Sequence, residues 1–144
     1  MENSTAKESY KETKKKAKEF YGLLGRIWCP ALNDYVVFNN VGFGHLIRKR
    51  GMLRAKGEQK RRLNLLADVV DMIANSQISI DHQKKEALRS IHLDGQKMTV
   101  ATPTDFWKFI QQKDGKLIKA IIRQFEGGAK HFFSAYAKKQ KSAQ

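Results

Sequence analysis

A histidine followed closely by basic residues is the most suggestive chemical feature of this chain. His45 comes after two closely spaced glycines, and the basic residues just beyond it are Arg48, Lys49 and Arg50. Histidine exchanges protons near neutral pH, and Lys and Arg stabilise negative charge on phosphate. Glycines let a backbone come close to a ligand. These residue types suit acid–base chemistry on a phosphate group.

A second group of polar residues stands near the end of the chain and consists of Arg123, His131, Ser134 and Tyr136. In a regular strand through residues 130–136, His131 faces away from Ser134 and Tyr136, because side chains alternate between the two faces. His131 and Ser134 share a cleft only if a bulge intervenes. We take the Ser134 and Tyr136 face as the polar one, with Tyr136 able to stack on a nucleobase.

The charge of the chain points to a polyanionic partner. Its 144 residues include 28 Lys and Arg against 14 Asp and Glu, which gives a formal net charge of +14. Residues 45–62 alone hold eight basic residues and one acidic residue. This excess predicts binding to a phosphate backbone first and to an acidic membrane second, although the cluster could also be only a solvated face. The substrate-binding candidates are Arg48, Arg54, Arg61, Arg62, His131 and Tyr136.

The sequence favours chemistry without a metal or a cofactor. It has no phosphate-binding glycine loop, no dinucleotide fingerprint and no zinc-protease motif. Its acidic residues are scattered, and the single Cys29 excludes an internal disulfide and a multi-cysteine zinc site. RNA cleavage by the 2′-hydroxyl, which leaves a 2′,3′-cyclic phosphate, needs a base, an acid and cations that stabilise the phosphorane.

The candidate residues can be given these roles. We expect His45 to be the general base or acid, with His92 in reserve. The cations expected to stabilise the phosphorane are Lys49, Arg50 and Arg123, and the residues expected to position the substrate are Ser134 and Tyr136.

The first half of the chain reads as helices around one short strand. Residues 1–26 predict a basic helix, partly flexible, and residues 35–38 predict a strand. We expect a short helix at residues 45–50 and a longer one at residues 58–75. Arg61 and Arg62 would then lie in the first turns of the longer helix, where its dipole disfavours cations.

The second half reads as strands. Strand-like runs lie at residues 78–80, 88–93, 98–101, 106–110, 116–125 and 130–136. Asp-Gly and Gly-Gly pairs separate several of them, as in hairpins. Helices followed by an antiparallel meander predict an α+β fold. We expect a domain over residues 27–136, preceded by the helix of residues 1–26 and followed by a basic tail, residues 137–144.

Several segments together resemble a known superfamily. They read VVFNNVGFGHLIRKR, RRLNLLADVVDMI, WKFIQQ, KLIKAIIRQF and KHFFSAY. Their order and residue types are similar to those of the barnase/EndoU/colicin/RelE-like ribonucleases, in particular the small phage- and toxin-associated members. The resemblance implies helices packed on a four- to five-stranded antiparallel sheet whose exposed face cleaves RNA without a metal. It places His45, Lys49 or Arg50, Arg123 and Ser134 at matching catalytic positions.

The resemblance also implies a partner, because toxins of this kind are held by an acidic antitoxin or immunity protein. Two other functions stay open: a non-catalytic RNA- or DNA-binding module, and attachment to an anionic membrane through Lys14, Lys15 and Lys16. No apolar run approaches the roughly 20 residues of a membrane span, and no export signal is apparent. We therefore expect a cytoplasmic protein.

Overall fold

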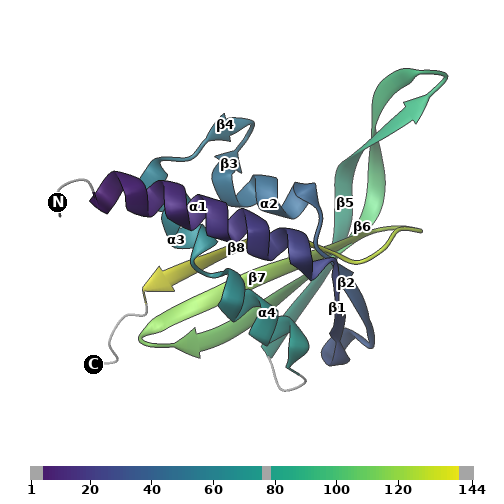
Figure 1. Ribbon diagram of the computed structural model, residues 1–144. Coiled ribbons are helices and arrows are strands. Elements are labelled where there is room, and N and C mark those ends of the chain that lie inside the picture. The colour runs from purple at the N-terminus through teal and green to yellow at the C-terminus, as the bar shows by residue number, and fades with distance from the viewer. Residues whose placement is uncertain (1–4, 76–78, 140–144) are drawn as a thin grey trace.

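The computed structural model describes residues 5–75 and 79–139. Its helices are α1 (Thr5–Leu24), the 3-10 turn η2 (Pro30–Leu32), α2 (Asn40–Ile47), α3 (Lys56–Leu63) and α4 (Leu66–Ala74). Its strands are β1 (Arg26–Cys29), β2 (Asp34–Val37), β3 (Arg48–Lys49), β4 (Met52–Leu53), β5 (Ser79–Leu93), β6 (Gln96–Lys113), β7 (Lys116–Phe125) and β8 (His131–Lys139). Figure 1 shows the helices gathered along one side of a strongly curled sheet. The α+β class is as predicted.

The main sheet is mixed, which corrects the expected four- to five-stranded antiparallel sheet. Its six strands follow the order β1-β2-β8-β7-β6-β5. Strands β5 to β8 form the antiparallel meander that the turn signals predict. Strand β2 then adds parallel to β8 through the pair Val37 and His131, and the Val37 N–H donates to the carbonyl of Lys130 at 2.9 Å. This pairing joins segments far apart in sequence, which local patterns cannot indicate.

One apolar core lies between the sheet and helices α1, α2 and α4. Ile118, Ala120 and Ile122 of β7 are buried on the same face of the sheet, as alternation requires. Helix α1 belongs to this core. The ring of Tyr21 packs against Phe132, and its hydroxyl donates to the carbonyl of Asn39 at 2.6 Å.

Helix α2 overlaps only the start of the short helix expected at residues 45–50. The chain is helical over Asn40–Ile47, and residues 48–53 form a small hairpin, so the helix begins and ends earlier than expected. Asn39 caps the helix by accepting from the Val41 N–H at 3.1 Å. Gly42 allows the close approach of α2 to β8, because a Cβ there would lie 2.5 Å from the carbonyl oxygen of Phe132.

The long helix expected at residues 58–75 is two helices with a break at Asn64 and Leu65. Leu63, Leu65 and Leu66 are all buried, and one straight helix cannot turn three such positions toward the same core. Because of the break, Arg61 and Arg62 lie in the last turn of α3, where the helix dipole favours cations. The expected unfavourable placement of these arginines is therefore wrong.

Strands β5 and β6 are much longer than the short runs expected from the sequence. Beyond the pair Thr104 and Phe125, β6 no longer pairs with β7, and residues 87–102 continue as a two-stranded hairpin, here called the arm. The arm projects from the body in Figure 1. Pro103 lies where β6 leaves β7, at a position where a missing N–H is well tolerated. Ile78, expected to begin this strand, lies outside the described residues.

Candidate functional site

A β-bulge in β8 changes the faces that sequence alternation assigned. Ile122 pairs with Phe132, but Ile121 pairs with Ser134, so Phe133 is an extra residue. Arg123 pairs with His131, two positions from Ile121 along β7. His131 and Ser134 therefore lie on the same face of the sheet, opposite to the buried Ile122 and Phe132. The strict alternation expected through residues 130–136 does not hold.

The bulged Phe133 is the centre of the candidate site. The imidazole of His45, in the last turn of α2, lies with its centroid 4.1 Å from that of the Phe133 ring. The Cζ of Arg123, on β7, lies 4.1 Å from the same ring centroid. One aromatic ring thus holds together a histidine and an arginine that are 78 positions apart in the sequence.

His45 is suited to accept a proton at neutral pH. Its side chain is partly buried, and burial lowers its pKa below the ordinary 6.5. The positive charges of Arg123, Arg54 and Arg62 lower the pKa further, because they disfavour a second nearby cation. The imidazole is therefore neutral at pH 7, which is the form a general base needs.

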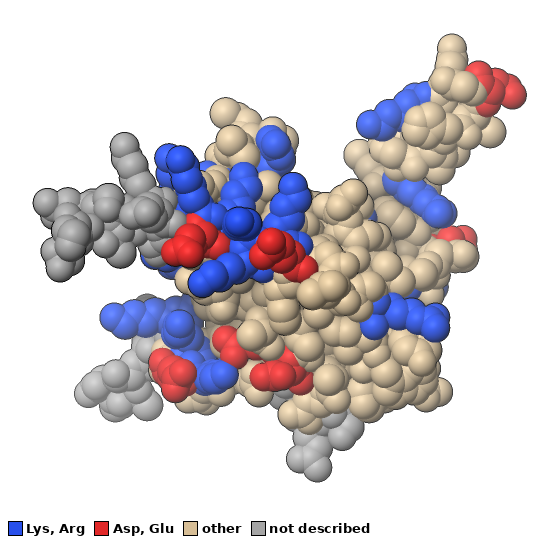
Figure 2. All heavy atoms as spheres, in the orientation of Figure 1, with Lys and Arg blue, Asp and Glu red and all other residues tan. Residues whose placement is uncertain are grey.

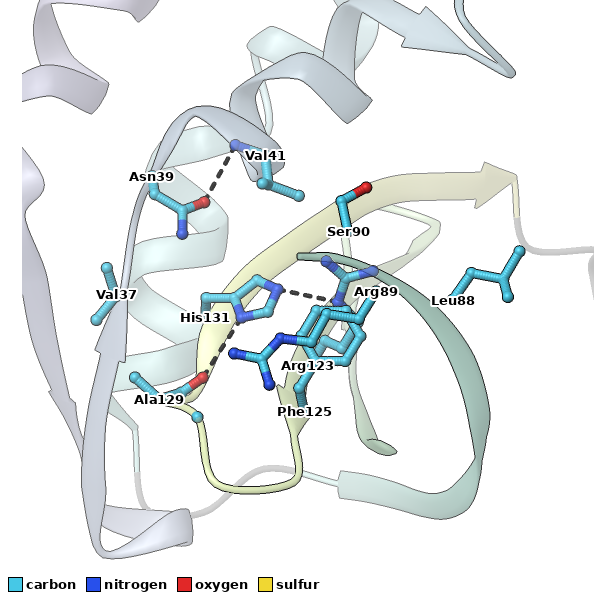
Figure 3. A pocket seen from close by; sticks show the side chains of 11 residues that line it. Val37, Asn39, Val41, Leu88, Arg89, Ser90, Arg123, Phe125, Ala129 and His131 are labelled. Carbon is cyan, nitrogen blue, oxygen red and sulfur yellow. Dashed lines mark hydrogen bonds between the residues drawn. The ribbon is translucent and has the colours of Figure 1, made fainter. Parts of the chain in front are cut away.

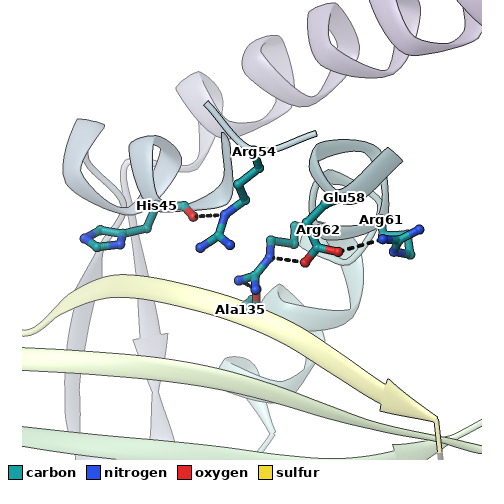
Figure 4. Close-up of polar contacts among 6 residues, drawn as sticks. All are labelled: His45, Arg54, Glu58, Arg61, Arg62 and Ala135. Carbon is teal, nitrogen blue, oxygen red and sulfur yellow. Dashed lines mark hydrogen bonds and ion pairs between the residues drawn. The ribbon is translucent and has the colours of Figure 1, made fainter. Parts of the chain in front are cut away.

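Two further arginines lie beside β8, in a row that begins with His45. The Nε of Arg54 donates to the carbonyl of His45 at 3.1 Å, and Nη1 of Arg62 donates to the carbonyl of Ala135 at 3.0 Å. Figure 4 shows these three side chains in a row above the strand, and Glu58 beside Arg62. The Glu58 carboxylate accepts from Arg62 at 2.7 Å, so part of the positive charge of Arg62 is compensated.

Tyr136 continues the row on the same face. Its ring centroid lies 5.8 Å from the Cζ of Arg62 and 5.8 Å from the Nζ of Lys119, the residue that pairs with it on β7. An aromatic ring between two cations can bind a nucleobase while the cations bind phosphates. The sequence analysis does not identify Lys119, although its alternation with the buried Ile118 and Ala120 could have placed it on the face of the sheet opposite the core.

Arg123 is positioned by His131. The Nε of Arg123 donates to Nε2 of His131 at 2.9 Å, so the imidazole must be unprotonated on that nitrogen. His131 is only 8% exposed, and its burial together with the charge of Arg123 lowers its pKa to about 4. Burial lowers the pKa of Arg123 to about 10, so its guanidinium stays charged at pH 7. His131 thus acts as an acceptor that orients Arg123.

Other predicted site residues lie apart from this group. Arg48, Lys49 and Arg50 are exposed on the β3–β4 hairpin, which projects beyond the end of α2 in Figure 1. The hairpin turns at Arg50, whose φ is 53°, so this residue is not on a helix beside His45. Arg61 is exposed and pairs with Glu58 at 2.7 Å. Figure 2 shows Lys and Arg gathered over this end of the molecule, near α1, α3 and the hairpin.

The remaining residues differ in their exposure and in their distance along the fold from the His45 group. Ser134 shares the face of Arg123 but is only 8% exposed. His92 is exposed on the arm and pairs across it with Lys97, so it lies on a different element from the His45 group. Arg89 was missed by sequence reasoning and lies where the arm joins the body. Its pattern in the sequence is that of an ordinary exposed strand residue.

Comparisons with protein-family models, with curated proteins and with solved structures found no match for this chain. The resemblance to the ribonuclease superfamily therefore stays a prediction. Over residues 5–75 and 79–139, no three His, Cys, Asp or Glu side chains gather as ligands for a metal ion. Within the same residues, none of the helices combines the length and the apolarity needed to cross a bilayer.

Proposed function

We propose that this protein is an endoribonuclease that cleaves RNA without a metal ion, by attack of the 2′-hydroxyl on the adjacent phosphate. The observation that carries the proposal is the contact of His45 and Arg123 with the same Phe133 ring. The centroid of that ring lies 4.1 Å from the centroid of the His45 imidazole and 4.1 Å from the Cζ of Arg123. A neutral imidazole and a charged guanidinium are then close enough to act on one phosphate and the ribose beside it. These are the two groups that such a reaction needs first.

The proposed reaction begins at the ribose. His45 takes the proton from the 2′-hydroxyl, and the 2′-oxygen attacks phosphorus to form a phosphorane. Arg123, whose Nη groups are not used by His131, stabilises the charge on the phosphorane oxygens. The bond from phosphorus to the 5′-oxygen breaks, and this oxygen takes a proton from solvent. The products are a 2′,3′-cyclic phosphate and a 5′-hydroxyl end.

Arg54, Arg62, Lys119 and Tyr136 would bind the RNA on one side of the scissile bond. The cations of this row can bind phosphates, and the Tyr136 ring between Arg62 and Lys119 can stack on a base. The cations exposed on the β3–β4 hairpin would add long-range attraction rather than chemistry, because Lys49 and Arg50 lie off this row. An acidic protein that covers the row would inhibit the enzyme, as an antitoxin or immunity protein does.

The proposal is tested by incubating a single-stranded RNA with the protein in excess EDTA. We expect cleavage by the wild-type chain and by His92→Ala, which removes an exposed histidine on the arm. His45→Ala should lose at least about 100-fold in rate, the usual contribution of a general base. Cleavage that requires Mg²⁺, or that survives in His45→Ala, would contradict the proposal.

A non-catalytic RNA-binding module is the second candidate, and one observation favours it. On the described part of this face, His131 is committed to Arg123, so a second histidine that could act as the acid is missing. The same row of cations and Tyr136 would bind a strand without cleaving it. Tight RNA binding with no turnover in EDTA or Mg²⁺ would favour this function over the nuclease.

A further inference from the structure

Another site lies beside Arg123, between the base of the arm and the start of α2. It is a cavity of about 440 Å³. Its walls come from four parts of the chain, and the residues that line it include Val41, Leu88, Arg89, Arg123, Phe125 and His131. Figure 3 shows Arg89 and Arg123 close to the ring of Phe125, with His131 bound to Arg123. A space of this size is large enough for one nucleotide.

Two arginines of the cavity are arranged around one aromatic ring. The Cζ of Arg123 lies 4.3 Å from the centroid of Phe125, and the Cζ of Arg89 lies 5.2 Å from it. A Cβ added at Gly128 would lie 4.0 Å from Nη2 of Arg89, so this guanidinium extends from the arm to the turn between β7 and β8. The curl of the sheet thus brings together cations from β5 and β7, which are not neighbouring strands.

The positive charge in this cavity is uncompensated. None of the residues that line it is Asp or Glu. Within the described chain, Arg89 has no carboxylate partner and Arg123 donates only to the neutral His131. Arg61 and Arg62 differ, since both pair with Glu58 at 2.7 Å. Two nearby guanidiniums that share no anion repel each other, and a bound dianion or phosphodiester would relieve this cost.

The first turn of α2 adds to the positive electrostatic potential in this cavity. Asn39, its N-cap, and Val41 line the cavity, so the positive end of the helix dipole lies at its wall. The apolar side chains of Val41 and Leu88 lie beside the two arginines. A cavity with two guanidiniums and an apolar wall suits a ligand that has a phosphate group and an attached sugar or base.

We propose that this cavity is a phosphate-binding subsite in which Arg89 and Arg123 hold the phosphate of a nucleotide next to the one that is cleaved. The identification of the ligand as an RNA phosphate rests on the proposed function, whereas the affinity for phosphate itself does not. Arg123 then stands between two phosphates, with Phe125 on the side of the subsite and Phe133 on the side of His45. Arg89 is the residue that serves the subsite alone.

The test uses the full chain, inorganic phosphate and a single-stranded RNA. In the His45→Ala protein, phosphate should shift the side-chain NMR signals of the Nε–H groups of Arg89 and Arg123. Arg89→Gln should weaken RNA binding several-fold and make the log–log salt dependence less steep by about 0.7, the value for one phosphate contact on a single strand. The matched control is Arg26→Gln, which removes one exposed charge on β1 and should change neither.

The outcomes separate this inference from the proposed function. Phosphate binding at Arg89 in the His45→Ala protein, together with no RNA cleavage by the wild-type chain, would support the subsite and contradict the nuclease. A different result would overturn the subsite and still support the nuclease. In that case the wild-type chain cleaves RNA, but Arg89→Gln and Arg26→Gln have the same affinity for RNA and the same salt dependence. The absence of phosphate-induced shifts at both arginines would also overturn the subsite.

Discussion

Replacing Gly42 by Ala should destabilise the protein, because α2 touches β8 at this residue. A Cβ at Gly42 would lie 2.5 Å from the carbonyl oxygen and Cδ2 of Phe132, and 2.6 Å from the Tyr21 hydroxyl. The Phe132 side chain is fully buried, and the Tyr21 hydroxyl is held by its bond to Asn39. None of these atoms can move without breaking other contacts, so the methyl group must displace the helix.

The size of the effect follows from the cost of overpacking. An added methyl in a tight core costs about 1–3 kcal/mol, even though Ala favours a helix over Gly by about 1 kcal/mol. A change of 1 kcal/mol shifts Tm by about 4 °C for a domain of this size. We therefore expect Gly42→Ala to lower Tm by about 4–12 °C in a thermal melt followed by circular dichroism.

Gly44 provides the matched control in the same helix. A Cβ at Gly44 would meet nothing within 4 Å, so only the gain in helix propensity remains. Gly44→Ala should raise Tm by about 2–4 °C. Equal Tm values for the two variants would refute the close packing of α2 against β8. They would also refute the position of His45 beside Phe133, because α2 carries His45.

Three further predictions concern the charged groups of the site. The pKa of His131 is about 4 in the folded chain and 6.5 in the unfolded chain. Between these pH values the unfolded chain binds more protons than the folded chain. The free energy of unfolding should therefore fall by up to about 3 kcal/mol as the pH drops from 6.5 to 4. Urea unfolding at several pH values measures this, and His131→Gln should flatten the dependence; an unchanged slope would contradict the burial of a neutral imidazole. Arg54→Gln should raise the pKa of His45 toward 6.5 in an NMR titration, since one of the cations that lower it is gone; a constant pKa would refute that coupling. Arg62→Met should cost about 1–2 kcal/mol in urea unfolding, because the Ala135 carbonyl and Glu58 lose a donor, whereas Arg26→Met should cost less.

The sequence is most informative where local patterns decide the structure. Periodicity and turn residues are enough to predict the α+β class and the helix before Gly25. They also predict the hairpins at Asp94-Gly95 and Asp114-Gly115. Gly25 and both Asp-Gly pairs have the positive φ values that these turns require. The positions of these elements could therefore be read before their packing was known.

Long-range packing decides what the sequence could not indicate. The pairing of β2 with β8 depends on residues almost a hundred positions apart, and the bulge at Phe133 reverses an alternation that looked regular. The bulge brings Phe133 under His45 and Arg123, while Lys49 and Arg50, close to His45 in sequence, turn away on a hairpin. Arg89 joins Arg123 only because the sheet curls. Proximity along the chain was a poor guide to proximity in the site.

The ends of the RNA products test the central claim most directly. A short single-stranded RNA is incubated with the protein in EDTA, and the fragments are analysed by mass spectrometry. Attack by the 2′-hydroxyl, with His45 as the base and Arg123 on the phosphorane, predicts fragments that end in a 2′,3′-cyclic phosphate, and none from His45→Ala. Fragments with 5′-phosphate ends, or intact RNA with the wild-type chain, would contradict it.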